Sequence, residues 1–244
     1  MEERRGESGW GPLYRAGAIA AGAAVVCYVV GFVLAFASPA PAAADGLTML
    51  EDVAAHRTVY IVRQLVWLVP SLFLMVTFLA LVVAGWQRGR ALAAIAGTVS
   101  VSSWAISFAW PTTGDGSPAM VVLSDRYAAA TTEAARASYV AGAELLSALN
   151  DVPAAIGVLQ TLGILLVGLL MLRGSFGRGV AILGVVTGAV GIVSEVLRPV
   201  MGAAYAAYGL LLFLWLAWVV VALWRLSRAA LDAPLAGAVA DVPA

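Results

Sequence analysis

Apolar and polar positions divide the chain into six long apolar runs separated by shorter, more polar segments. Each run contains about 18 to 27 residues, enough for an α-helix rising 1.5 Å per residue to cross a hydrocarbon core about 30 Å thick. The pattern therefore predicts an all-α protein, a polytopic membrane helix bundle of six transmembrane helices. The runs are Ala16 to Ala37, Val59 to Gly85, Ala91 to Trp110, Val152 to Leu172, Gly179 to Val196 and Ala203 to Trp224.

The segment of residues 38–58, between the first two runs, contains an amphipathic stretch. Leu47, Leu50 and Val53 fall at helical spacing beside acidic residues. This pattern is typical of a short helix that lies at a membrane surface. We therefore expect an interfacial helix from about Leu47 to His56.

The longer segment of residues 111–151 carries two sets of helix-start signals. Ser117 can cap a helix that has Pro118 in its first turn, and Thr131 or Thr132 can cap a second one. We therefore expect two short helices here, the second of which leads into the fourth apolar run.

The distribution of arginines predicts the orientation of the chain. Arginines gather at both chain ends and in the short loops Trp86 to Arg90 and Arg173 to Arg178, whereas the intervening segments carry few. The positive-inside rule assigns such loops to the cytoplasm. The N-terminus and the C-terminus are therefore both predicted to be cytoplasmic, and residues 38–58 and 111–151 to lie outside.

Composition supports a single membrane domain. Hydrophobic residues make up 62% of the 244 residues and the mean hydropathy is +0.95, while the formal net charge is zero. This leaves too little polar surface for a soluble monomer. We assign residues 1–15 to a cytoplasmic tail and residues 16–228 to the transmembrane domain. The Ala- and Pro-rich residues 229–244 are predicted to form a disordered cytoplasmic tail.

Small residues predict how two of the helices pack. Gly184 and Gly188 form a GxxxG step in the fifth run, and Gly157, Thr161 and Gly168 share one face of the fourth. Small residues allow helix backbones to approach closely. Packing inside the bundle is the preferred interpretation, because a homo-oligomer built through such faces needs a separate exposed face.

Arg63 lies inside an apolar run, and its charge there requires an explanation. A charged side chain at the centre of a spanning helix costs about 2.5 to 3.5 kcal/mol on insertion scales, so it usually faces the bundle interior or a wet cavity. Arg63 lies roughly 7 Å below the outer boundary of the second run, with Gln64 beside it and Trp67 one turn further in. It is therefore a candidate for a polar site.

Glu195 is the second such residue, and Arg198 follows it at helical spacing. Further polar residues open the fourth and sixth runs, at the same predicted outer level. Together they predict a cluster in which Glu195 and Asp151 balance Arg63 and Arg198. The candidate ligand-binding residues are Arg63, Gln64, Trp67, Asn150, Asp151, Glu195, Arg198, Tyr205 and Tyr208.

Three interpretations of this cluster remain open. Glu195 and Arg198 can form an exposed pair at a helix end while Arg63 extends to the lipid headgroups. The charges can instead form an ion-pair network that locks the helices together. They can also face a substrate, with Glu195, Asp151 and Arg63 as the catalytic candidates.

Several kinds of chemistry are excluded by residues that the chain lacks. It contains no lysine, so a retinal Schiff base is excluded, and His56 and Cys27 are single. One chain therefore cannot form a bis-histidine haem site or the usual zinc sites. We predict no metal and no cofactor. Because membrane orientation explains the basic loops, nucleic acid is not predicted as a partner.

Parts of the second half resemble a large family of bacterial six-span membrane proteins of unknown function. The resemblance lies in Ala148 to Asp151, Leu162 to Leu170, Arg173-Gly174-Ser175 and Ile182 to Gly188, and is best over residues 148–195. It implies a location in the bacterial inner (plasma) membrane. It supplies no catalytic residue.

The sequence therefore predicts a multi-pass protein in a lipid bilayer that either has a structural role or binds a small amphiphilic molecule near its outer face. An intramembrane enzyme acting on a lipid or isoprenoid, and a transporter of a small solute, are the alternatives. The sequence does not decide whether the protein is an enzyme.

Overall fold

The computed structural model of the protein describes residues 9–37, 45–110, 113, 116–151, 155–174 and 176–240. These residues are almost entirely helical, and the one β-type pairing among them is an isolated bridge between Thr113 and Gly116. The predicted all-α fold is confirmed.

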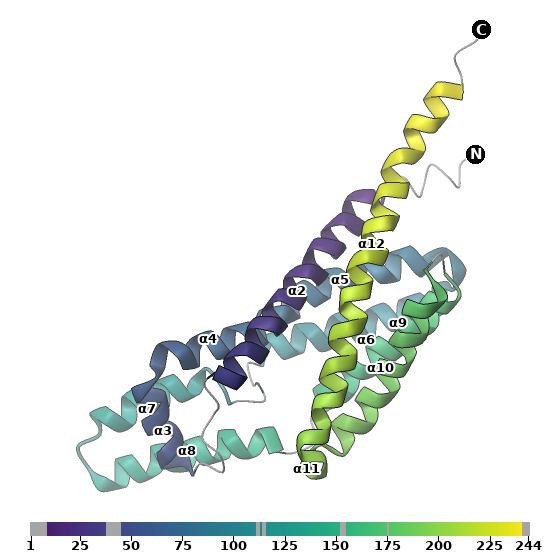
Figure 1. Ribbon diagram of the computed structural model, residues 1–244. Coiled ribbons are helices and arrows are strands. Elements are labelled where there is room, and N and C mark those ends of the chain that lie inside the picture. The colour runs from purple at the N-terminus through teal and green to yellow at the C-terminus, as the bar shows by residue number, and fades with distance from the viewer. Residues whose placement is uncertain are drawn as a thin grey trace.

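Within this part of the chain, six helical segments are long and apolar enough to cross a membrane. They form an elongated bundle in which the first and last helices are the longest single helices (Figure 1). The prediction of six spanning segments is therefore confirmed. The segments are α2 (Gly11–Ala37), α4 with α5 and η1 (Arg57–Leu68, Pro70–Gly85 and Trp86–Arg88), α6 (Arg90–Ala109), α9 (Ala155–Leu172), α10 (Arg178–Val196) and α12 (Ala206–Ala240).

The two terminal helices extend beyond the predicted runs. Helix α2 begins at Gly11, inside the expected tail of residues 1–15, and α12 continues to Ala240. A Cβ placed on Gly11 would lie 3.4 Å from Ala230 and Leu231, so the beginning of α2 packs against α12 past the predicted boundary. Residues 229–240, which the sequence assigns to a disordered tail, form the last part of α12, and residues 241–244 lie outside the described part.

The second spanning segment is divided at Pro70. Proline has no backbone N–H to donate, and its ring clashes with the carbonyl four residues earlier, so it interrupts a helix. Accordingly α4 ends at Leu68 and Pro70 begins α5. This break lies between Trp67 and Ser71, two residues that line the cavity described below.

Three helices outside the spanning segments form a separate layer at one end of the bundle, which we call the cap (Figure 1). The cap consists of α3 (Gly46–Ala55), α7 (Ala119–Ala129) and α8 (Glu133–Asp151), so the short helices predicted in both polar segments are confirmed. Ser117 Oγ accepts a hydrogen bond from the Ala119 N–H at 3.2 Å, and Thr132 Oγ1 accepts one from the Ala135 N–H at 3.3 Å. Both hydroxyls lie at the predicted helix starts.

The cap has its own apolar core, which contains Leu50 of α3, Met120 of α7 and Ala143 of α8. Tyr60 of α4 joins this core, and its hydroxyl donates a hydrogen bond of 3.0 Å to the Ser117 carbonyl. Because Tyr60 lies near the start of the second spanning segment, these contacts attach the cap to the bundle.

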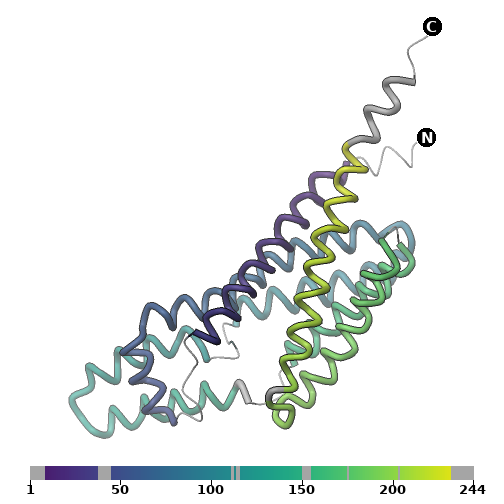
Figure 2. Tube along the Cα trace, viewed as in Figure 1, coloured from purple at the N-terminus to yellow at the C-terminus, as the bar shows by residue number. Residues whose placement is uncertain are grey.

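Helices α9 and α10 pack antiparallel along their length (Figure 2). Glycines line the contact on both helices: a Cβ on Gly168 would meet the Gly184 and Val185 backbone, and one on Gly188 would meet the Leu165 backbone. The small-residue faces predicted from the sequence are therefore used inside the bundle.

Candidate functional site

A cavity of about 520 Å³ lies within the bundle, at the end where α10 turns into α12. This is within the usual range for a small-molecule site. All six spanning segments contribute to its lining, and most of the lining is apolar or aromatic. The lining residues are Tyr28, Phe32, Trp67, Ser71, Trp104, Ser107, Gln160, Glu195, Arg198, Gly202, Tyr205, Ala206, Tyr208, Gly209 and Leu212.

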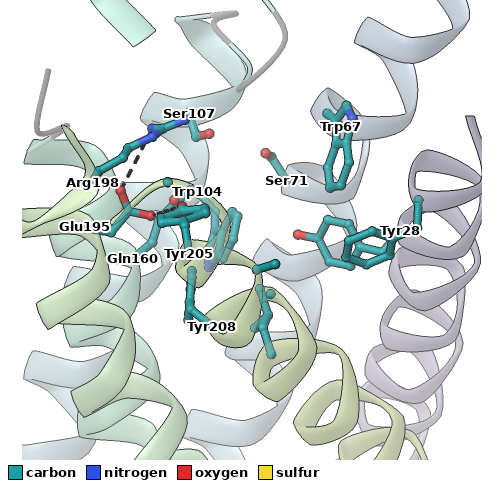
Figure 3. A pocket seen from close by; sticks show the side chains of 15 residues that line it. Tyr28, Trp67, Ser71, Trp104, Ser107, Gln160, Glu195, Arg198, Tyr205 and Tyr208 are labelled. Atoms are coloured by element: carbon teal, nitrogen blue, oxygen red, sulfur yellow. Dashed lines mark hydrogen bonds and ion pairs between the residues drawn. The ribbon is translucent and has the colours of Figure 1, made fainter. Parts of the chain in front are cut away.

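The cavity has two unlike sides. In Figure 3, Tyr28, Trp67 and Ser71 lie on one side, and Ser107, Gln160, Glu195 and Arg198 lie on the other. The Trp67 ring packs against Tyr28, with ring centroids 5.8 Å apart, and against the edge of Phe32. On this side, which we call the aromatic side, Trp67 therefore contacts both of the other rings.

Glu195 is the central polar residue of the opposite side. Only 5% of it is exposed. The Tyr205 hydroxyl donates a hydrogen bond of 2.5 Å to Glu195 Oε1, and an Arg198 guanidinium nitrogen lies 4.0 Å from Oε2. The carboxylate is thus partnered unequally, with a short hydrogen bond on one oxygen and a long ion pair on the other.

Gly157, in the first turn of α9, makes room for this carboxylate. A Cβ at Gly157 would lie 2.9 Å from Glu195 Oε1 and closer still to Cδ and Oε2. Real Cβ atoms are not found at such distances from their neighbours. Glu195 therefore packs directly against the backbone of α9, as the last contact of the glycine-lined seam between α9 and α10.

The turn between α10 and α12 supplies the partners of Glu195. It consists of α11 (Arg198–Met201) and η2 (Gly202–Tyr205). Gly202 has a φ of 49°, in the left-handed region that glycine adopts at little cost. The reversal places Arg198 over the Tyr205 ring, 5.3 Å from its centroid. Arg198, Tyr205 and Glu195 therefore form one local unit.

Tyr205 donates to Glu195 in its protonated form. Burial and the neighbouring Glu195 carboxylate raise the pKa of the Tyr205 hydroxyl well above its usual value of about 10. The phenol therefore keeps its proton at physiological pH, and Oε1 keeps its donor.

Two buried polar atoms of the lining residues have no hydrogen-bond partner in the described part of the chain. They are Glu195 Oε2, an acceptor, and Trp104 Nε1, a donor. Only 5% of Trp104 is exposed. Buried polar groups without partners are uncommon in native proteins, and each requires an explanation.

The structure brings together only part of the predicted ligand-binding set. Trp67, Glu195, Arg198, Tyr205 and Tyr208 all line the cavity. Glu195 is buried, which argues against the interpretation of an exposed pair at a helix end.

The other predicted residues lie elsewhere or are not described in full. Arg63 and Gln64 are buried on α4, and neither is among the residues that line the cavity. Gln64 Oε1 accepts a hydrogen bond of 2.8 Å from the hydroxyl of Thr113, which lies between α6 and α7. The burial of Arg63 argues against its extension to the headgroups. Asn150 and Asp151 end α8, and their side chains lie outside the described part.

Sequence reasoning missed several lining residues, including Tyr28, Trp104 and Gln160. Tyr28 and Trp104 lie within apolar runs, where an aromatic residue looks like core or a lipid anchor. Gln160 did carry a signal, because it is an amide in the middle of the fourth run. Among the described residues, no group of three or more His, Cys, Asp or Glu side chains lies close enough to hold a metal ion.

Comparisons with known proteins add no identity. No family model, curated protein or solved structure matches the chain. The resemblance to the bacterial six-span family stays a prediction.

Proposed function

We propose that this protein binds an amphiphilic small molecule inside the membrane. The observation that carries the proposal is the cavity of about 520 Å³, whose walls are aromatic and aliphatic. On one side a guanidinium and a phenol lie beside a buried carboxylate. Ligand sites are typically apolar cavities with a few convergent polar groups. A hydrocarbon chain fits the aromatic side and a polar head fits the side of Glu195.

Binding is better supported than catalysis. The intramembrane enzyme predicted as an alternative would use Glu195 or Asp151 as an acid and Arg63 to position a charged group. Arg63, the predicted positioning cation, is not part of the lining. A carrier would bind the same molecule, so binding is the step that the two functions share.

We further propose that the protein lies in the plasma membrane of a bacterium with the cap outside. Arg88 and Arg90 follow α5, and α2 begins and α12 ends at the same end of the bundle, opposite the cap (Figure 1). Arg15 and Arg228 both lie 5.9 Å from the ring centroid of Trp224 at that end. Aromatic residues are enriched at both membrane interfaces, and an excess of arginine is typical of the cytoplasmic one.

Mass spectrometry of the lipids that co-purify in mild detergent tests the binding proposal. Gly209 lines the cavity, and a Cβ there would meet only Phe32, at 3.7 Å. Gly209→Leu therefore fills cavity space without removing a polar group. The control is Gly22→Leu, because a Cβ at Gly22 meets nothing within 4 Å.

The expected result is a species enriched over bulk lipid with the wild type and with Gly22→Leu, and depleted with Gly209→Leu. The same lipid profile in all three proteins would contradict the proposal.

A further inference from the structure

We propose that the occupant of the cavity is an alcohol, that is, a neutral amphiphile whose hydroxyl group donates a hydrogen bond to Glu195 Oε2. This inference rests on the proposed binding function and adds the chemical class of the head group. Three observations carry it: the unmet hydrogen-bonding capacity of the cavity, its charge balance and the character of its walls.

The first observation concerns hydrogen bonds. The Tyr205 hydroxyl donates a hydrogen bond to Glu195 Oε1, whereas Oε2 has no hydrogen-bond donor among the described residues. Trp104 Nε1, from the same lining, has no acceptor there. An unmet buried acceptor is costly, so a ligand that supplies a donor gains affinity. A hydroxyl supplies both a donor for Glu195 and an acceptor for Trp104.

The second observation concerns charge. Glu195 and Arg198 are the only charged residues among the described lining residues, and their side chains lie 4.0 Å apart. An anionic head would place its charge next to the buried Glu195, and a cationic head would place its charge next to Arg198. Because the two protein charges already balance each other, a neutral head is favoured.

The third observation concerns the rest of the ligand. The side of the cavity away from Glu195 includes Tyr28, Phe32 and Trp67, and the Trp67 ring packs against both of the others. Leu212 adds an aliphatic surface. These walls offer hydrocarbon contacts, so the hydroxyl belongs to a molecule with a sizeable apolar body.

A matched ligand series tests the inference. Native mass spectrometry of the full-length protein in detergent would measure apparent Kd values for decan-1-ol, decyl methyl ether, decanoate and decyltrimethylammonium. The ether accepts a hydrogen bond as the alcohol does but donates none. We expect decan-1-ol to bind about tenfold more tightly than the ether, and more tightly than either ion.

Two variants identify the groups involved. Glu195→Met removes the acceptor, so the preference for alcohol over ether should disappear. Trp104→Phe removes a donor that both ligands can use, so both should bind more weakly while the preference stays. If Glu195→Met does not fold, the wild-type ligand series and Trp104→Phe still decide the question.

The outcomes separate the two proposals. Equal affinity for alcohol and ether, or tightest binding of either ion, would overturn the alcohol inference and leave amphiphile binding intact. Loss of the preference in Trp104→Phe, or its survival in Glu195→Met, would overturn the assignment to Glu195 Oε2. Binding of none of the four decyl compounds would count against the proposed binding function itself.

Discussion

Glu195 can occupy its position only because residue 157 is a glycine. The carboxylate lies so close to the α9 backbone that only a residue without a side chain fits opposite it. The hydrogen bond from Tyr205 limits how far the carboxylate can move away. The helical backbone at position 157 does not itself require a glycine. The Glu195 side chain that faces this position does.

Gly157→Ala should therefore destabilise the protein through Glu195. Overpacking costs about 1 to 3 kcal/mol, while replacing glycine by alanine inside a helix gains about 1 kcal/mol. The expected net effect is a loss of up to about 2 kcal/mol. In a Glu195→Ala background the obstacle is gone, and the same substitution should be neutral or stabilising.

Thermal unfolding in detergent of the two single variants, the double variant and the wild type gives the coupling energy between these residues. A Gly157→Ala effect of the same size in both backgrounds would show that Glu195 is not the obstacle.

At this scale, the sequence predicts the charged residues of the site better than its neutral ones. Glu195 and Arg198 stand out because charge in an apolar run is costly. Trp104 resembles any core aromatic, because the absence of a hydrogen-bond partner appears only in three dimensions. Arg63 is equally conspicuous in the sequence, yet the direction of its side chain depends on how α4 packs, and it does not line the cavity.

At the scale of helices, the α9–α10 seam determines where Glu195 lies. The seam pairs Gly168 with Gly184, Leu165 with Gly188 and Thr161 with Gly191, and ends with Glu195 against Gly157. Because each step of the seam brings a glycine into close contact with the facing helix, the register of the two helices is fixed. A shift of one turn would move the carboxylate out of the cavity.

Gly188→Ala should be more destabilising than Gly157→Ala. Its Cβ would meet the backbone of Leu165, which cannot rotate away as a side chain can. We expect a loss of about 3 kcal/mol or more. Gly22→Ala is the matched control, because nothing lies within 4 Å of its Cβ, and it should be neutral or slightly stabilising.

Chemical or thermal unfolding of Gly188→Ala and Gly22→Ala in the same detergent makes the comparison. Equal stability of the two variants would mean that the seam is looser than described.

The sequence predicts helices better than it predicts their ends and breaks. The six spanning segments and the three cap helices follow from apolar length, helical spacing and capping residues. The extension of α12 past residue 228 was not predicted, because an Ala- and Pro-rich composition looks like a tail and gives no sign of the contact with Gly11. Pro70 lies within an uninterrupted apolar run, so the hydropathy pattern does not indicate the break between α4 and α5.

At the scale of the whole molecule, the cap is joined to the bundle by polar contacts as well as apolar ones. The Arg57 guanidinium, at the start of α4, makes two hydrogen bonds to the Asp125 carboxylate of α7. These hydrogen bonds lower the pKa of Asp125 below its usual value.

The contribution of this ion pair to stability should depend on pH. An Asp whose pKa is lowered in the folded state stabilises it fully above the unfolded pKa of about 3.9, and the effect is lost as pH falls through the folded value. Wild type should therefore melt slightly higher than Asp125→Asn near pH 7, and the difference should shrink below about pH 4. Glu133→Gln is the control, because Glu133 is exposed on the cap. A difference that is independent of pH would refute this role.

The proposed orientation also belongs to the whole molecule. In a Cys27→Ala background, Ala137→Cys places an exposed thiol on the cap and Gln87→Cys places one in η1, at the other end of the bundle. A membrane-impermeant maleimide added to intact cells should label position 137 and leave position 87 unlabelled until the cells are opened. Labelling of position 87 alone in intact cells would show that the orientation is the reverse of the proposed one.

The most direct test of the central claim is to locate a bound amphiphile. A long-chain alcohol with a photoreactive diazirine in its chain would be cross-linked to the protein in lipid nanodiscs, and the labelled residues identified by peptide mass spectrometry. The account predicts labels on Phe32, Trp67 and Leu212 that excess decan-1-ol suppresses and Gly209→Leu abolishes. Labels confined to exposed apolar positions such as Val26 and Leu214, unaffected by either change, would contradict it.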